Sequence, residues 1–147
     1  MNDKYFPYGA LVLRVALGIV LVAHSVYLKL FVFTLPGTAS FFESIGLPGW
    51  FAYVVFAVEA ITGVALIAGY KTRICAAVVV PILLGATWAH LPNGWLFTAE
   101  NGGWEYPLFL TVIAAAVVLT GSGAYALDNR QASTGESPYA PTVEKSS

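Results

Sequence analysis

Long apolar runs alternate with short polar stretches along the chain, and this pattern predicts four membrane-spanning helices. The apolar runs cover residues 9–33, 50–69, 74–91 and 106–122. Each approaches the roughly 20 residues that a spanning helix requires, and the last two, at about 17–18 residues, are at the short end of that range. Of the 147 residues, 58% are hydrophobic and 10% are charged, whereas a soluble domain carries about 25% charged residues. We therefore expect an all-α integral membrane protein, folded as a four-helix transmembrane bundle in a lipid bilayer.

The connections between these runs predict how the helices are joined. Residues 34–49 contain Ser40-Phe41-Phe42-Glu43, which has the pattern of a helix-starting capping box. We expect a short interfacial helix in this first outer loop. Residues 70–73 form a tight turn, so the second and third spans should be antiparallel neighbours. Gly18, Gly63 and Gly85 lie within the first three spans, where small residues let helices approach closely.

Residues 1–128 are expected to form one membrane domain, and residues 129–147 a disordered cytoplasmic tail. The tail is rich in Ser, Pro, Thr and charged residues, a composition that does not bury a core. The first apolar run continues to Phe33, so we expect it to be a retained helix and not a cleaved signal peptide.

The basic residues predict the orientation in the membrane, because cytoplasmic loops are enriched in Lys and Arg. Outside the apolar runs, Lys and Arg lie before the first run, in the turn at residues 70–73 and after the last run, and residues 92–105 contain none. Both termini are therefore expected in the cytoplasm. All four tryptophans then fall at the opposite, outer interface: Trp50, Trp88, Trp95 and Trp104.

Overall charge and cysteine content exclude several classes of function. The formal net charge is −1, which gives no electrostatic basis for binding nucleic acid. The single cysteine, Cys75, excludes an intrachain disulfide or a CxxC redox pair. The chain has no Gly-rich dinucleotide motif and no haem-attachment motif. Electron transfer would therefore need a quinone or a redox partner protein.

Among the ionisable residues inside apolar runs, two of opposite charge stand out, because an unpaired charge there costs several kcal/mol or more. They are Arg14 in the first run and Glu59 in the second. On a straight α-helix, Arg14 shares a face with Gly18, Ser25 and Lys29, so this face should point into the bundle. Counting residues at about 1.5 Å each leaves a gap of roughly 8 Å along the membrane normal between Arg14 and Glu59. We predict a buried Arg14–Glu59 ion pair, serving helix register or an inner proton relay.

Polar and aromatic residues from three spans gather near the expected outer surface. The candidates are His24, Lys29, Trp88, His90, Trp104 and Glu105. Aromatic walls with a few polar anchors suit a small flat ligand, and a quinone head group fits because imidazole or ammonium can supply donors and protons. No HxxxH or HxxE spacing occurs within a span, so we predict no metal site.

Several motifs resemble the DoxX family of small four-helix membrane proteins. Leu13-Arg14-Val15-Ala16-Leu17-Gly18, Ala23-His24 and Lys29-Leu30 are similar to its first helix. Glu59 with Gly63 and Gly69-Tyr70-Lys71-Thr72-Arg73 are similar to its second block. The third block is matched by His90-Leu91-Pro92-Asn93-Gly94-Trp95 and Gly102-Gly103-Trp104-Glu105-Tyr106-Pro107-Leu108. The resemblance covers about residues 11–128.

This resemblance implies a multi-pass protein of the inner membrane with a redox association. Some relatives resemble the small subunit of thiosulfate:quinone oxidoreductase, and others are linked to oxidative-stress defence or quinone detoxification. We therefore expect a quinone-associated subunit or partner of a membrane redox system, without a firmly assigned cofactor or catalytic residue. The alternatives are a non-catalytic membrane scaffold that recruits partner proteins and an oligomeric small-molecule permease.

Overall fold

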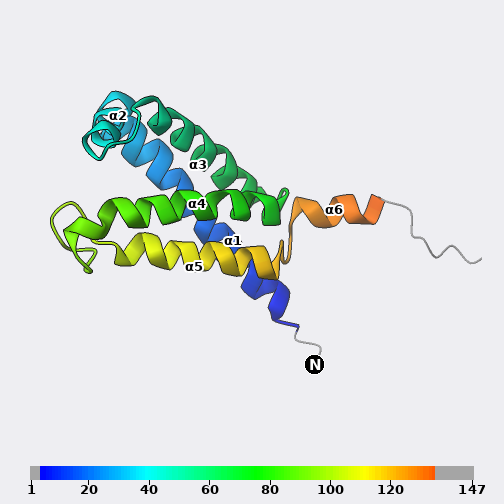
Figure 1. Cartoon of the computed structure of the whole chain (residues 1–147). Coiled ribbons are helices and arrows are strands. Elements are labelled where there is room, and N and C mark those ends of the chain that lie inside the picture. Colours follow the sequence, from blue (N-terminus) through cyan, green and yellow to red (C-terminus); the bar gives the residue numbers. More distant parts are fainter. Residues whose placement is uncertain (1–3, 135–147) are drawn as a thin grey trace, which may run out of the picture.

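The computed structural model describes residues 4–134 and is built from helices (Figure 1). Over this range the structure contains no strand. In chain order the helices are α1 (Phe6–Val22), η1 (Ala23–Val32), α2 (Leu35–Ser44), α3 (Trp50–Ala68), α4 (Thr72–His90), η2 (Leu91–Asn93), α5 (Glu105–Thr120) and α6 (Leu127–Thr134). The predicted all-α fold is confirmed.

Three helical segments are long and apolar enough to cross a membrane: Phe6–Val32, Trp50–Ala68 and Thr72–Asn93. A fourth apolar helix, α5, has 16 residues. At about 1.5 Å per residue it is shorter than a hydrocarbon core of roughly 30 Å. The outside of the bundle carries many exposed apolar side chains, including Val12, Ile61, Val112 and Leu119. Such a surface requires a lipid environment, because few soluble proteins expose so large an apolar area.

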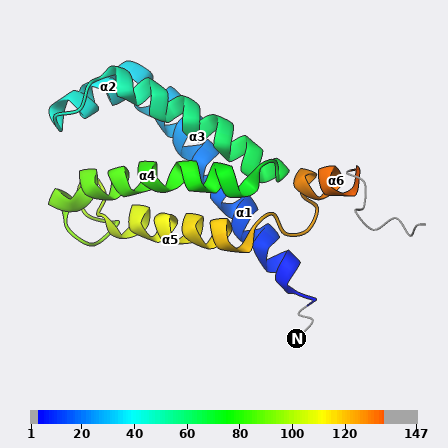
Figure 2. The same ribbon diagram turned by 45° about the vertical axis from the view of Figure 1, so that its right-hand side comes forward.

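The helices pack as two pairs, α1 on α3 and α4 on α5, with further contacts between α3 and α4 and between α1 and α5 (Figures 1 and 2). The core between the pairs is aliphatic and includes Leu17, Leu21, Leu66, Val79 and Val117. We call the end of the bundle that carries the Tyr70–Lys71 turn the turn end. The opposite end, where residues 91–104 connect α4 to α5, is the loop end.

Gly18 and Gly63 lie where α1 and α3 cross, and they account for the close approach of these helices. A Cβ atom at Gly18 would lie 2.7 Å from the carbonyl oxygen of Gly63, and one at Gly63 would lie 3.1 Å from that of Gly18. The prediction for Gly85 was wrong, because a Cβ atom there would meet no atom within 4 Å. Gly85 lies on an exposed face of α4, so it contributes no packing within the bundle.

The first spanning helix changes its winding after Val22 and continues as the ten-residue π-helix η1. At its end the Phe33 N–H donates to the carbonyl oxygen of Leu28, five residues earlier, at 2.7 Å. Such windings are rare and often mark functional sites. Side-chain donors gather at the junction, where Ser25 Oγ donates to the carbonyl oxygen of Leu21 at 2.8 Å. Nothing in the sequence pattern distinguished η1 from an ordinary α-helix.

The first connection contains the expected short helix, but the helix begins earlier than the capping box indicated. The N-cap of α2 is Thr34, whose side chain accepts a hydrogen bond from the Gly37 N–H at 3.2 Å. Ser40 lies inside the helix, and its hydroxyl donates to the Pro36 carbonyl oxygen. The Ser40–Glu43 capping box was therefore wrong, because Leu35-Pro36 starts the helix with proline in its first turn, where no intrahelical N–H bond is lost.

At the turn end, Arg14 is buried and its guanidinium caps the last turn of α3. Its Nη1 donates to the carbonyl oxygens of Leu66, at 2.7 Å, and Ile67, at 2.9 Å. Its Nη2 donates to the carbonyl oxygen of Ala124 at 3.2 Å. Gly69 ends α3 in a left-handed conformation, and a Cβ atom there would lie 2.6 Å from Nη1 of Arg14. Arg14 therefore satisfies carbonyls that a helix C-terminus leaves free.

Asp128 caps the neighbouring helix, α4, at the same end. Its carboxylate accepts hydrogen bonds from the Lys71 N–H at 2.6 Å, the Thr72 N–H at 3.1 Å and the Ser122 hydroxyl at 2.5 Å. Asp128 belongs to α6, which ends at Thr134. The helix α6 therefore extends into residues 129–134, the first part of the predicted disordered tail. The rest of that predicted tail, residues 135–147, lies outside the described residues.

Candidate functional site

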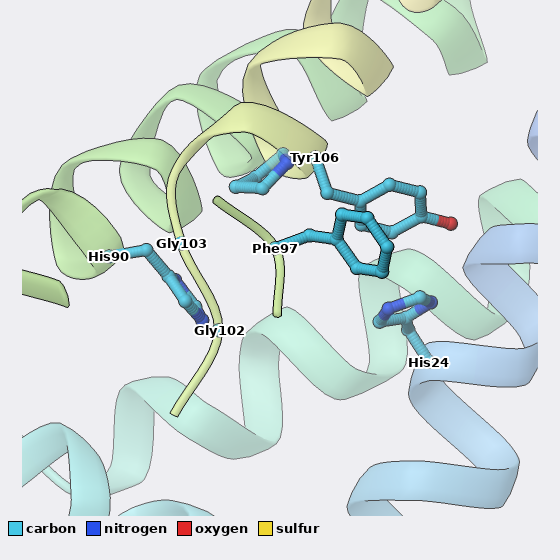
Figure 3. A pocket seen from close by; sticks show the side chains of 7 residues that line it. His24, His90, Phe97, Gly102, Gly103 and Tyr106 are labelled. Carbon is cyan, nitrogen blue, oxygen red and sulfur yellow. The ribbon is translucent and has the colours of Figure 1, made fainter. Parts of the chain in front are cut away.

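A pocket of about 280 Å³ lies at the loop end, where η1, α4 and α5 meet the connection between α4 and α5. Its lining includes both histidines of the chain, His24 and His90. The remaining lining residues are Phe97, Gly102, Gly103, Tyr106 and Pro107. Figure 3 shows the two histidines approaching from opposite sides, one from η1 and the other from the end of α4. None of the lining residues is an acid, a lysine or an arginine.

His24 is held in place by its own helix and by α5. Its Nδ1 lies 2.9 Å from the carbonyl oxygen of Val20. A carbonyl oxygen can only accept a hydrogen bond, so Nδ1 carries the proton. The imidazole stacks on the Tyr106 ring, with 5.8 Å between the ring centroids and 28° between the planes. This arrangement leaves Nε2 of His24 without a hydrogen-bond partner in the described part of the chain.

His90 is held in the same way at the C-terminal end of α4. Its Nδ1 lies 2.8 Å from the carbonyl oxygen of Ala86 and therefore donates to it. Nε2 of His90 points toward Gly102, where a Cβ atom would lie 3.9 Å away. No hydrogen bond to this Nε2 comes from residues 4–134. Both histidines thus bind backbone through Nδ1 and leave Nε2 free.

The connection between α4 and α5 folds back onto the bundle and brings Phe97 to the pocket. Asn93 holds it, because its Nδ2 donates to the carbonyl oxygens of Asn101, at 3.2 Å, and Gly102, at 2.8 Å. Gly103 is required for this fold, since a Cβ atom there would lie 2.2 Å from the carbonyl oxygen of Leu96. The turn residues near position 102 were visible in the sequence, but their place beside the histidines was not.

Glu105 lines a second pocket, of about 370 Å³, together with Phe97, Tyr106 and Phe109. The rings of Phe97 and Tyr106 line both pockets. One carboxylate oxygen of Glu105, Oε2, is buried and has no hydrogen-bond partner among the described residues. Glu105 is the first residue of α5, and the positive end of the helix dipole favours a carboxylate there. Glu105 therefore lies next to the histidine pocket without lining it.

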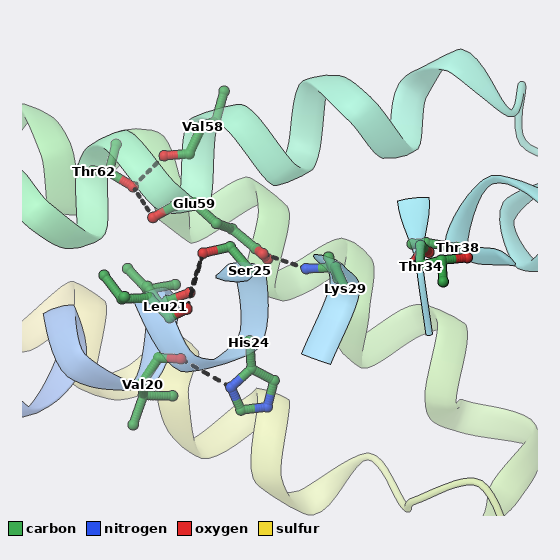
Figure 4. A network of polar contacts seen from close by, with 11 residues as sticks. Val20, Leu21, His24, Ser25, Lys29, Thr34, Thr38, Val58, Glu59 and Thr62 are labelled. Atoms are coloured by element: carbon green, nitrogen blue, oxygen red, sulfur yellow. Dashed lines mark hydrogen bonds and ion pairs between the residues drawn. The ribbon is translucent and has the colours of Figure 1, made fainter. Parts of the chain in front are cut away.

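Glu59 forms its ion pair with Lys29 and not with Arg14 (Figure 4). The prediction of an Arg14–Glu59 pair was therefore wrong. The Arg14 side chain extends toward the C-terminal end of α3 and is engaged by three carbonyl oxygens there. Lys29, assigned to the ligand site from the sequence, lies in η1 and reaches Glu59 across the contact between η1 and α3. It does not line the histidine pocket.

The two tryptophans expected as pocket walls lie elsewhere. Trp104 packs edge to face against Trp95, with ring centroids 4.5 Å apart, and so braces the connection between α4 and α5. Trp88 is 53% exposed on the surface of α4. Residue count placed both at the correct end of the bundle but gave no information on which way they face. The aromatic walls are instead Phe97 and Tyr106, which the sequence analysis missed.

Comparison with known proteins identifies the chain's relatives. The family model for DoxX matches residues 9–92. A Bacillus subtilis (strain 168) protein named "Putative oxidoreductase CatD" is 41% identical over 127 residues, which cover 86% of this chain and 89% of that protein. No solved structure matches. The family model covers more than half of the chain, and the relative is similar over nearly its whole length. The chain therefore belongs to the DoxX family.

Proposed function

We propose that this membrane protein is a subunit or partner in a membrane redox system and binds a quinone-type head group in the histidine pocket. The observation that carries the proposal is that two histidines from different helices face one aromatic-lined pocket. His24 and His90 would bind the oxygens of the head group and carry protons to and from them. Glu105, beside the pocket, would exchange these protons with solvent.

The size and the walls of the pocket support a small flat ligand. Its volume of about 280 Å³ is at the lower end of the roughly 300–1,000 Å³ range of small-molecule sites, which suits a single aromatic ring. Phe97, Tyr106 and Pro107 supply apolar walls. The position at one end of the spanning helices would let an isoprenoid tail remain in the bilayer while the ring enters the pocket.

The redox part of the proposal draws on the family and on the relative's name. The relative is named as an oxidoreductase, and this chain carries no motif for a dinucleotide or haem. Electrons would therefore pass between the bound head group and a partner protein. We also propose that the pocket opens on the outer side of the inner membrane, with both termini in the cytoplasm, as the distribution of Lys and Arg indicates.

The test is ligand retention by the purified protein. The protein is extracted in detergent, its lipid extract is analysed for quinones and quinols, and a short-tailed benzoquinone and its quinol are each titrated while tryptophan fluorescence is recorded. His24→Ala and His90→Ala should each weaken binding of whichever of the two rings binds more tightly by about tenfold or more, because a ligand oxygen loses its partner in the pocket. Tyr27→Phe and Trp88→Phe are the controls, since both side chains are exposed and neither lines the pocket.

The scaffold alternative predicts a different result. If both histidine variants accumulate normally and bind both rings as the unmodified protein does, the pocket is not their site. Failure of the unmodified protein to retain or bind any quinone-type compound would favour a non-catalytic scaffold, and transport of a solute by reconstituted vesicles would favour a permease.

A further inference from the structure

The two histidines share one feature: Nδ1 of each ring forms a hydrogen bond with a backbone carbonyl oxygen of its own helix. Nδ1 of His24 donates to the Val20 carbonyl oxygen, and Nδ1 of His90 donates to the Ala86 carbonyl oxygen. In a neutral imidazole one nitrogen carries the proton and the other has a lone pair. Both histidines are therefore fixed with the proton on Nδ1, and both present the pocket with an acceptor, Nε2.

An acceptor discriminates between the two redox states of a quinone-type ring. The oxidised ring has carbonyl oxygens, which need donors, and a neutral Nε2 cannot donate. The reduced ring has hydroxyl groups, which can donate to Nε2. From this geometry we infer that the pocket selects the reduced, dihydroxy form of the head group, with ring hydroxyls donating to Nε2 of His24 and His90. This inference rests on the proposed function, whose substrate class it narrows.

The placing of the histidines further favours hydroxyls at opposite ends of one ring. His24 enters from η1 and His90 from the end of α4, on opposite sides of the pocket (Figure 3). A 1,4-dihydroxy ring presents its two donors in opposite directions. The lining holds no lysine or arginine that could donate to a carbonyl oxygen in place of imidazole. Lys29, the cation in η1, is engaged by Glu59.

The preference belongs to the neutral imidazole, because a protonated imidazole donates from both nitrogens. The titratable groups near the histidines are Tyr106, stacked on His24, and Glu105 beside it in α5. On the α3 side, Glu59 is neutralised by Lys29.

The first test reads the tautomers directly. The chain contains two histidines, so nitrogen NMR of protein labelled with ¹⁵N-histidine reports on these two rings alone. The expected spectrum at about pH 8 shows both rings protonated at Nδ1. A spectrum with the proton on Nε2 of both rings would overturn the inference, whether or not any quinone binds.

The second test compares three rings of similar shape: a short-tailed benzoquinone, its quinol, and the dimethyl ether of that quinol, which has no hydroxyl to donate. At about pH 8 the quinol should bind about tenfold or more tightly than the other two, since each of them leaves Nε2 unpaired. His24→Gln is the matched variant, because its amide offers both a donor and an acceptor and should reduce the difference between quinol and quinone.

The possible outcomes separate this inference from the proposed function. If quinone and quinol bind equally at about pH 8, or the quinone binds more tightly, the head-group site stands and the inference is overturned. Equal binding of the quinol and its dimethyl ether would also overturn it, because hydroxyl donation would then contribute nothing. If none of the three rings binds, the proposed function itself is wrong, and the inference falls with it.

Discussion

Lys29 and Glu59 form an ion pair that joins the π-helix η1 to α3 inside the bundle. The two side chains differ in exposure: that of Lys29 is 18% exposed and that of Glu59 is 7% exposed. The carboxylate is therefore the member of the pair that depends more on its partner. Water reaches the ammonium group more easily, and its long side chain can move toward an interface.

Removing either member of this pair should destabilise the protein, and the two losses should differ. Breaking a buried pair costs about 3–5 kcal/mol because it leaves a charge uncompensated. Lys29→Met should be the more harmful change, because it leaves the more buried group, the Glu59 carboxylate, without a partner. Glu59→Leu should be the milder change, because it leaves the more exposed Lys29 ammonium unpaired. The double variant should be more stable than the sum of the single changes indicates. Thermal unfolding of the detergent-purified protein, followed by circular dichroism, measures these effects.

Arg14 supplies the control for the comparison of the single and double variants of Lys29 and Glu59. Arg14 contacts backbone carbonyls at the turn end and does not pair with Glu59. Arg14→Met and Glu59→Leu should therefore be additive. Coupling between these two as large as that between Lys29 and Glu59 would contradict the pairing described above.

Arg14→Lys should destabilise the protein although it keeps the positive charge. The guanidinium serves three carbonyl oxygens, and an ammonium group lacks the planar fork that reaches them together. A buried carbonyl left without a donor costs roughly 1–3 kcal/mol. Arg73→Lys is the matched control, because Arg73 is exposed and its guanidinium donates to the carbonyl oxygen of Val118 at the same end of the bundle. An Arg14→Lys protein as stable as the Arg73→Lys protein would argue against the cap.

The close contact of α1 and α3 can be tested with single methyl groups. Gly18→Ala places a Cβ atom 2.7 Å from a backbone oxygen, so the helices must move apart, at a cost of about 1–3 kcal/mol. Gly85→Ala adds its methyl in open space on α4 and should be neutral or stabilise by up to about 1 kcal/mol through helix propensity. Comparing the unfolding temperatures of the two variants measures the difference. Equal effects would show that Gly18 is not needed for packing.

Asp128 should make the stability of the turn end depend on pH. Burial alone would raise the pKa of this carboxyl, but hydrogen bonds from Ser122 and from the N–H groups of Thr72 and Lys71 outweigh it, and the pKa is lowered. Because the pKa of Asp128 is lower in the folded state, its carboxylate stabilises the fold fully at pH values above the pKa of the unfolded state, about 3.9. This stabilisation is lost as the pH falls through the pKa of the folded state.

Asp128→Asn should therefore destabilise the protein by about 0.5–2 kcal/mol at neutral pH, as loss of a helix cap does. The difference from the unmodified protein should shrink below about pH 4, where the native carboxyl becomes protonated too. Unfolding temperatures across a pH series provide the measurement. Glu100→Gln, which removes an exposed carboxylate at the loop end, should show no comparable change. A constant Asp128→Asn effect at all pH values would contradict the assignment.

The predicted orientation can be tested with fused reporters. A reporter joined after Arg130 should be active in the cytoplasm, because Lys and Arg concentrate at the turn end. A reporter inserted at Gly94, in the connection between α4 and α5, should report the opposite side. If the reporter after Arg130 were active outside the cytoplasm, the proposed position of the histidine pocket would be reversed as well.

The helices could be predicted from the sequence because their signal is local. Apolar runs of nearly spanning length gave α3, α4 and α5 to within a few residues, and the short turn before Thr72 made α3 and α4 neighbours. Residue count also brought His24 and His90 to one end of the bundle. These results depend on helix rise alone, which every α-helix shares.

Partners and side-chain directions could not be predicted in the same way. The partner of Glu59 is Lys29 in η1, whose π-winding has no signature in the sequence, whereas Arg14 turns toward the end of α3. The pocket walls depend on how residues 91–104 fold back, which Asn93 and Gly103 determine through contacts with residues up to nine positions away. Sequence spacing carries the depth of a residue in the bilayer but not the neighbour that it faces.

The cap on α3 has a consequence for the order of assembly during synthesis. Arg14 is made early, yet one of its three acceptors, Ala124, follows it by 110 residues. The N–H groups at the start of α4 likewise have no carboxylate acceptor until Asp128 has been synthesised. The turn end can therefore close only after all the spanning helices have left the ribosome. Truncation before residue 124 would leave the first helix inserted but its arginine incompletely paired, a state that membrane quality control could recognise.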